Sequence, residues 1–162
     1  MSTNPYAPPT ANVEDVLQAN ESPPIWNPEV AARWSLLFSP IFGATIQMKN
    51  WQALGEPEKA AQARQWALGS IGFFALLMVA GIFLPESTSL NLGSRVAGLG
   101  LLIAWYTLNG KQQVAYVTAH FGKTYPRKNW GVPLLYALLS LVAFLVLVFV
   151  IAFVFGLLQG DA

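Results

Sequence analysis

Residues 130–160 read WGVPLLYALLSLVAFLVLVFVIAFVFGLLQG and contain no charged side chain. A second uncharged stretch, ALGSIGFFALLMVAGIFLP, runs from Ala67 to Pro85. A mainly apolar segment of about 18 residues or more can cross the ~30 Å hydrocarbon core of a bilayer as a helix. These two stretches therefore predict transmembrane helices, and the fold class predicted from them is an all-α membrane protein.

The composition of the 162 residues agrees with this class. Charged residues make up 10% of the chain and hydrophobic residues 54%, whereas soluble domains carry about 25% charged residues. The polar stretches are too short, and too poor in apolar periodicity, to form a separate soluble domain. We expect a flexible Pro-rich tail over residues 1–26 and a single transmembrane helical domain over residues 27–160.

The first helix is predicted at about residues 28–52. Asn27 offers an N-cap, Pro28 suits the first helical position, and an acid follows in the first turn. Ser39-Pro40 interrupts the pattern, which predicts either one kinked helix or two short helices, the second capped by Ser39. Residues 34–48 are uncharged but span only about 22 Å, so this segment either crosses marginally or re-enters.

Three further helices are predicted at about 57–84, 92–121 and 131–158. The third is expected to leave the membrane near Tyr106 and to continue as an amphipathic surface helix until Gly122. Together with the Pro-broken segment, these helices predict a small bundle of three full transmembrane helices and one marginal, kinked or re-entrant helix.

The basic residues predict the orientation. Lys and Arg collect in cytoplasmic loops, and residues 49–66 contain three of them, whereas residues 109–129 contain four. Residues 85–92 and the C-terminal tail contain no Lys or Arg. Both basic loops are therefore expected in the cytoplasm and the C-terminus outside, while the side of the N-terminus depends on whether residues 33–48 cross. Trp51, Trp66, Tyr125 and Trp130 are expected to form an aromatic belt at the inner boundary.

Few residues qualify as a site. The chain has no cysteine and one histidine, His120, so the sequence predicts no metal site, no cofactor and no catalytic residue. Arg95 is closely bounded by apolar sequence, where a charge is costly. Both Arg95 and Glu86 are expected near the outer boundary of the membrane, and Glu86 is the candidate partner of Arg95 in an ion pair or an interaction site.

Two stretches resemble known bacterial proteins. Asn4-Pro5-Tyr6-Ala7-Pro8-Pro9, followed by Val13-Glu14-Asp15, resembles the tail of small inner-membrane proteins, including some of the RDD family. The Arg-Asp-Asp signature is absent, so no transport role is implied. Residues 36–44, with Asn50-Trp51, Leu54-Gly55 and EPEKA, are similar to uncharacterised multi-pass proteins. The resemblance implies a bacterial inner (cytoplasmic) membrane.

The functional expectation follows from what the spans lack. No acid lies within a predicted span and no nucleotide or hydrolase motif is present, so we expect a non-enzymatic membrane component. Its partners would be the lipid bilayer and another protein, as for an accessory or immunity-type protein, with a homo-oligomer open and nucleic acid excluded. The alternative is a subunit of an oligomeric channel or transporter, for which Thr107, Gln112, Gln113 and Thr118 offer a polar line.

Overall fold

The computed structural model describes residues 22–85 and 87–160, and within them the secondary structure is helical apart from one isolated bridge between Ile25 and Arg127. The elements are α2 (Pro28–Phe38), α3 (Pro40–Ala53), α4 (Pro57–Phe83), α5 (Thr88–Trp105), the π-helix η1 (Tyr106–Gly110), α6 (Lys111–Phe121) and α7 (Gly131–Gly160). The all-α class is confirmed for these residues.

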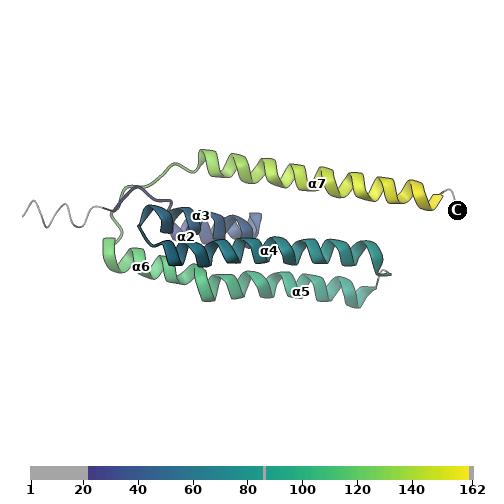
Figure 1. The fold of residues 1–162 in the computed structure, drawn as a ribbon, viewed down its shortest axis with the longest axis horizontal. Coiled ribbons are helices and arrows are strands. Elements are labelled where there is room, and N and C mark those ends of the chain that lie inside the picture. The colour runs from purple at the N-terminus through teal and green to yellow at the C-terminus, as the bar shows by residue number, and fades with distance from the viewer. Residues whose placement is uncertain (1–21, 86, 161–162) are drawn as a thin grey trace, which may run out of the picture.

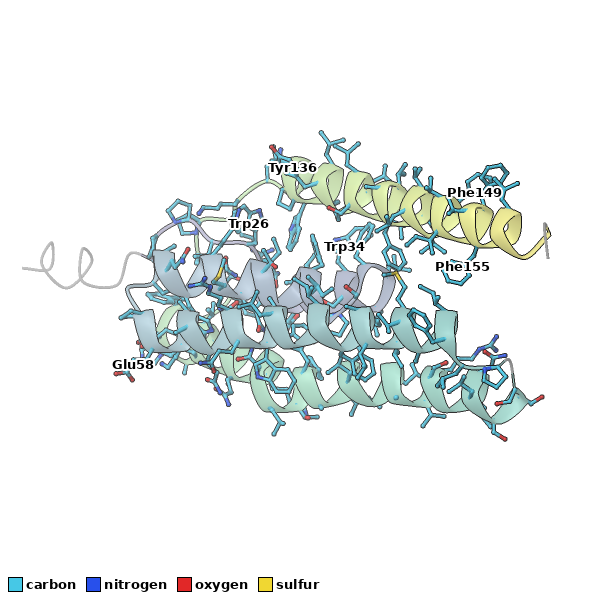
Figure 2. All side chains as sticks on the ribbon, turned by 45° about the vertical axis from the view of Figure 1, so that its right-hand side comes forward. Trp26, Trp34, Glu58, Tyr136, Phe149 and Phe155 are labelled. Atoms are coloured by element: carbon cyan, nitrogen blue, oxygen red, sulfur yellow. The ribbon has the colours of Figure 1, made fainter. Side chains whose placement is uncertain are left out.

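Two of the described helices, α4 and α7, are long and apolar enough to cross a membrane. Their most apolar windows are 11% and 0% buried, so neither helix forms the core of the described fold. Most of the apolar side chains of α7 between Val132 and Leu157 are exposed and project outward, as Figure 2 shows around Tyr136 and Phe149. The third full span predicted from the sequence, α5, does not reach the same apolarity.

Helices α2 and α3 form a hairpin. Asn27 caps α2 as predicted, because its Oδ1 accepts from the backbone N–H of Glu29 at 2.9 Å. Asn50, near the end of α3, hydrogen-bonds to the backbone of Trp26, just before α2. The chain therefore returns to the end of the bundle where it started, and the hairpin runs only part of the way along α4 (Figure 1).

The break at Ser39-Pro40 is confirmed, but its mechanism differs from the prediction. Ser39 adopts φ 107° and ψ 164°, and its side chain makes no capping hydrogen bond to α3. Its backbone N–H instead closes α2 by donating to the carbonyl of Ser35 at 2.9 Å. A sharp change of backbone direction, and not a side-chain cap, separates the two helices.

The third segment also departs from the prediction. Helix α5 begins at Thr88 and not at residue 92, because the Ser87 hydroxyl accepts from the N–H of Leu90 and caps the helix. The segment 106–121 continues as a helix to Phe121, as predicted, and α6 has one buried and one exposed face, but the buried face is partly polar. The π-helix η1 and α6 both carry buried side chains, among them Asn109 and Gln113.

The interior of the bundle is small. The buried face of α4 presents Ala60, Ala63, Ala67 and Ser70, and such small side chains let helices approach closely. Trp51 and Trp105 fill the space opposite them. Trp51 is 1% exposed, so its predicted place in an aromatic belt is wrong. At Gly43 a Cβ would overlap the ring of Trp105 and the hydroxyl of Ser35, which explains the glycine there.

The prediction of a flexible tail over residues 1–26 is wrong for its last five residues. Residues 1–21 lie outside the described part of the chain, but residues 22–26 belong to the folded unit. Ile25 is fully buried, its N–H donates to Pro126 O, and its carbonyl accepts from Lys128 N–H. The loop before α7 is thereby joined to the residue just before α2, at the end of the bundle opposite to the α4–α5 turn and the C-terminus (Figure 1).

Candidate functional site

Four fully buried amide side chains lie where α3, η1 and α6 meet. They are Gln47 and Asn50 of α3, Asn109 of η1 and Gln113 of α6, and each is 1% exposed or less. A buried amide that lacks hydrogen bonds is costly. Their donors and acceptors therefore need hydrogen-bond partners within the fold.

Each of the four amides finds partners within the chain. Asn109 Nδ2 donates to Gln47 Oε1 at 2.7 Å, and Gln47 Nε2 donates to the carbonyl of Gly110 at 3.3 Å. Gln113 Nε2 donates to the backbone carbonyl of Gln47 at 3.0 Å. Asn50 Nδ2 donates to Gln113 Oε1 at 3.0 Å. We call these four residues the amide network.

The amide network also closes the hairpin. The side chain of Asn50 pairs with both backbone groups of Trp26, accepting from its N–H at 3.0 Å and donating to its carbonyl at 2.8 Å. One side chain thus joins the start of α2, the end of α3 and, through Gln113, α6. A satisfied buried network of this kind favours one arrangement of its elements, so its role is to fix the hairpin on α6.

Next to the amide network lies a partly exposed cluster around Tyr116. The Tyr116 hydroxyl donates to Glu56 Oε1 at 2.9 Å, and Lys59 Nζ lies 3.2 Å from Glu56 Oε2. The same ammonium lies 4.2 Å from the centre of the Tyr116 ring and 4.9 Å from that of Trp51. His120 stacks on Tyr116 with a centroid separation of 4.1 Å.

The contacts of this cluster shift two pKa values. The hydrogen bonds from Tyr116 and from Lys59 hold the pKa of the Glu56 carboxyl below its ordinary value of 4.5. The bond to that carboxylate, with a smaller effect of burial, raises the pKa of the Tyr116 phenol above 10.0. The same hydrogen bonds favour the state in which Glu56 is ionised and Tyr116 is protonated. Both pKa values therefore move away from neutral pH, and neither group is tuned to exchange protons there.

The residues before α2 and the loop before α7 lie at the same end of the bundle as the amide network. Trp26 Nε1 donates to the carbonyl of Asn129 at 2.9 Å, and Lys128 Nζ lies 4.6 Å from the Trp26 ring. The guanidinium of Arg127 lies 5.4 Å from the Tyr125 ring. Burial raises the pKa of Tyr125, and the nearby charge of Arg127 opposes this shift.

The site residues predicted from the sequence do not meet in a cavity. Arg95 is exposed on α5, and its candidate partner Glu86 lies outside the described residues. His120 is exposed, and its Nδ1 lies 2.9 Å from the carbonyl of Tyr116. Of the predicted polar line, Gln113 is buried in the amide network. Thr107, Gln112 and Thr118 are exposed on the outside of their helices.

Residues 22–85 and 87–160 contain no group of three or more His, Asp or Glu side chains that could hold a metal ion. The best-formed depressions there are open grooves. One, of about 300 Å³, lies between the C-terminal halves of α4 and α7 and is lined by Met78, Ile82, Ile151 and Phe155. It carries no chemistry beyond contact with apolar groups.

Comparison of the chain with protein-family models, with curated proteins and with solved structures finds no match.

The amide network was missed in the sequence, although a signal was present. Gln47 and Asn50 are three residues apart, and Asn109 and Gln113 are four apart, so each pair can share one helix face. The second pair looked like part of a solvated surface helix because Lys111 and Gln112 stand between its members. Only the fold shows that the two pairs face one another.

Proposed function

We propose that the chain is a bacterial inner-membrane protein in which α4, α5 and α7 cross the bilayer and the α2–α3 hairpin enters and returns. The length and exposure of α4 and α7 support the proposal that these two helices cross the bilayer. Helix α5 runs back along α4 from a short turn (Figure 1), so it would have to cross if α4 does. The hairpin helices are about 16 Å and 21 Å long by residue count, too short to span.

The charge distribution supports one orientation. The basic residues of the α3–α4 turn region and of residues 111–128 gather at the end of the bundle where the hairpin also begins and ends. By the positive-inside rule, this end faces the cytoplasm. The start of α2 then lies on the cytoplasmic side and the C-terminus outside.

We further propose that the protein is not an enzyme and acts as an accessory component that binds a protein partner through its cytoplasmic end. One observation carries this proposal: the buried amide network joins α3, η1 and α6 to the backbone of Trp26. Ile25 and Trp26 in turn hold the loop before α7, so α6 and this loop form a defined surface. A surface held in one arrangement binds at a lower entropic cost. Of the polar line that a channel subunit would need, Gln113 is already hydrogen-bonded inside this network.

A site-specific photo-cross-linker tests the interaction. Placed at Thr118, which is exposed on α6, it should yield a discrete protein adduct in intact cells. The matched position is Val142, exposed on α7 and within its apolar stretch, where no such adduct is expected. Adducts from position 142 and none from position 118 would move the interaction to the membrane-spanning helices.

Ion flux tests the channel alternative separately. Purified protein in liposomes should give no more flux than empty liposomes, because the described spans offer no line of polar groups to replace an ion's hydration shell. A robust flux that disappears on Arg95→Ala would favour a channel subunit, with Arg95 as its site.

A further inference from the structure

The loop before α7, residues 122–130, carries three cations that no carboxylate in the described part of the chain pairs with at ion-pair distance, although the charge of Glu29 is near enough to act on Tyr125. Its cations are Lys123, Arg127 and Lys128. Within residues 22–85 and 87–160, the one ion pair joins Lys59 to Glu56, so none of these three cations has a carboxylate oxygen within 4.0 Å there. Two of them lie over aromatic rings instead, Arg127 over Tyr125 and Lys128 over Trp26.

The loop is held in place by backbone contacts. Ile25 N–H donates to Pro126 O at 3.2 Å, and Lys128 N–H donates to Ile25 O at 2.9 Å. The Trp26 indole adds its bond to Asn129, and Arg127 donates to the carbonyl of Lys123 at 3.1 Å. A ligand that binds here does not have to order the loop, so less free energy is lost on binding.

The loop also lies at the depth where lipid head groups are expected. It leads directly into α7, whose apolar side chains are exposed from its first turns onward, and Figure 2 shows Trp26 beside the start of this helix. Trp130, the last residue of the loop, contacts the hairpin, and its ring centroid lies 6.4 Å from that of Phe42. Trp and Tyr prefer the boundary between hydrocarbon and water. Cations beside them would lie level with the lipid phosphates.

We propose that Trp26, Tyr125, Arg127 and Lys128, with Lys123 at the edge, form a binding surface for the head group of an anionic phospholipid. The guanidinium of Arg127 can donate two hydrogen bonds to one phosphate, and Lys128 adds a second charge. The rings of Trp26 and Tyr125 cover the glycerol and upper acyl region. An acidic protein segment would match the charges but not the apolar flank that continues into α7. This surface would anchor the start of α7 whether or not the protein partner proposed above exists.

Lipid titration tests this surface. The purified full chain, in nanodiscs of phosphatidylcholine with increasing phosphatidylglycerol of the same acyl chains, is analysed by native mass spectrometry for bound phosphatidylglycerol. A basic residue near an anionic membrane contributes about fivefold in affinity. Arg127→Gln combined with Lys128→Gln should therefore weaken phosphatidylglycerol binding about thirtyfold, and each single variant about fivefold. Lys128→Arg should keep nearly full affinity.

The matched control is Arg95→Gln, which removes one positive charge from the exposed surface of α5, away from the loop, and should leave the affinity unchanged. If the double variant fails to fold by circular dichroism, the single variants decide. Equal binding of the two lipids, or unchanged affinity in the Arg127 and Lys128 variants, would overturn the proposal. Displacement of phosphatidylglycerol by a soluble polyglutamate peptide would overturn it as well and assign the surface to an acidic protein segment.

Discussion

At the scale of single residues, the amide network shows how polar side chains can lie in the interior of so apolar a chain. Asn50 uses its carbonyl and both of its amide hydrogens, because it accepts from Trp26 N–H and donates to Trp26 O and Gln113 Oε1. Removing one member leaves each of its former partners buried with one hydrogen bond fewer. The loss should exceed the value of the single bond that is removed.

Replacing Gln113 tests this loss against its neighbour in sequence. Gln113→Leu should destabilise the protein by about 1–3 kcal/mol, because Asn50 Nδ2 and the Gln47 carbonyl each lose a buried partner. Gln112 is exposed and bonds only within its own helix, so Gln112→Leu should change stability by less than about 0.5 kcal/mol. Thermal unfolding in detergent measures both. Equal effects would show that the network contributes no more than a surface glutamine.

The Tyr116–Glu56 pair makes a prediction about pH. Because the folded pKa of Glu56 is lowered, its contribution to stability is present above 4.5 and is lost as the pH falls from 4.5 through the lowered value. Because the pKa of Tyr116 is raised, its contribution is present below 10.0 and is lost as the pH rises through the raised value. In Tyr116→Phe, the Glu56 pKa measured by carboxyl ¹³C NMR should move up toward 4.5. An unchanged value would assign the shift to Lys59 alone.

At the scale of elements, the turn between α2 and α3 carries strain. Ser39 has a positive φ with an extended ψ, a region that is open to glycine and costs other residues about 1–3 kcal/mol. Ser39→Gly should therefore raise stability by about 1 kcal/mol, since the Ser39 side chain caps nothing. Ser39→Val should lower it. Chemical denaturation of the two variants measures the difference, and a stabilising valine would mean that the turn is not in this conformation.

Packing between the hairpin and α5 depends on Gly43. A Cβ at this position would overlap Trp105 and Ser35, and overpacking of a core costs about 1–3 kcal/mol. Gly43→Ala should lower the unfolding temperature, whereas Gly69→Ala on α4, where a Cβ meets open space, should not. A neutral Gly43→Ala would place the hairpin farther from α5.

Most helix boundaries could be predicted from the sequence, and the buried contacts that were not predicted have a physical reason. Asn27-Pro28, Ser39-Pro40 and Pro57 fix helix ends through local backbone chemistry, and the structure has helix ends at all three. The burial of Ile25 and Gln113 depends on partners about 100 and 60 residues away in the chain. No local pattern carries that information, so residues 22–26 looked like tail and Gln113 was not expected on the buried face of α6.

At the scale of the whole molecule, the arrangement is asymmetric along the membrane normal that we propose. Long-range hydrogen bonds and cations, with Trp26, Trp51 and Trp130, collect at the end that contains the hairpin ends, α6 and the loop before α7. The opposite half consists of α4, α5 and α7 with apolar contacts, such as that of Phe83 with Phe155 at 6.5 Å. Function should therefore reside at the first end, and substitutions on the exposed face of α7 should be tolerated if they stay apolar.

In the proposed topology, the α2–α3 hairpin enters the membrane and returns to the side from which it came. Because the chain has no natural cysteine, single-cysteine labelling with a membrane-impermeant maleimide tests it directly, in intact spheroplasts and in inverted membrane vesicles. We expect Pro24→Cys and Thr124→Cys to react only in inverted vesicles, and Ser89→Cys only in spheroplasts. Labelling of Pro24→Cys in spheroplasts, on the same side as Ser89→Cys, would contradict the account, because residues 28–53 would then cross the membrane.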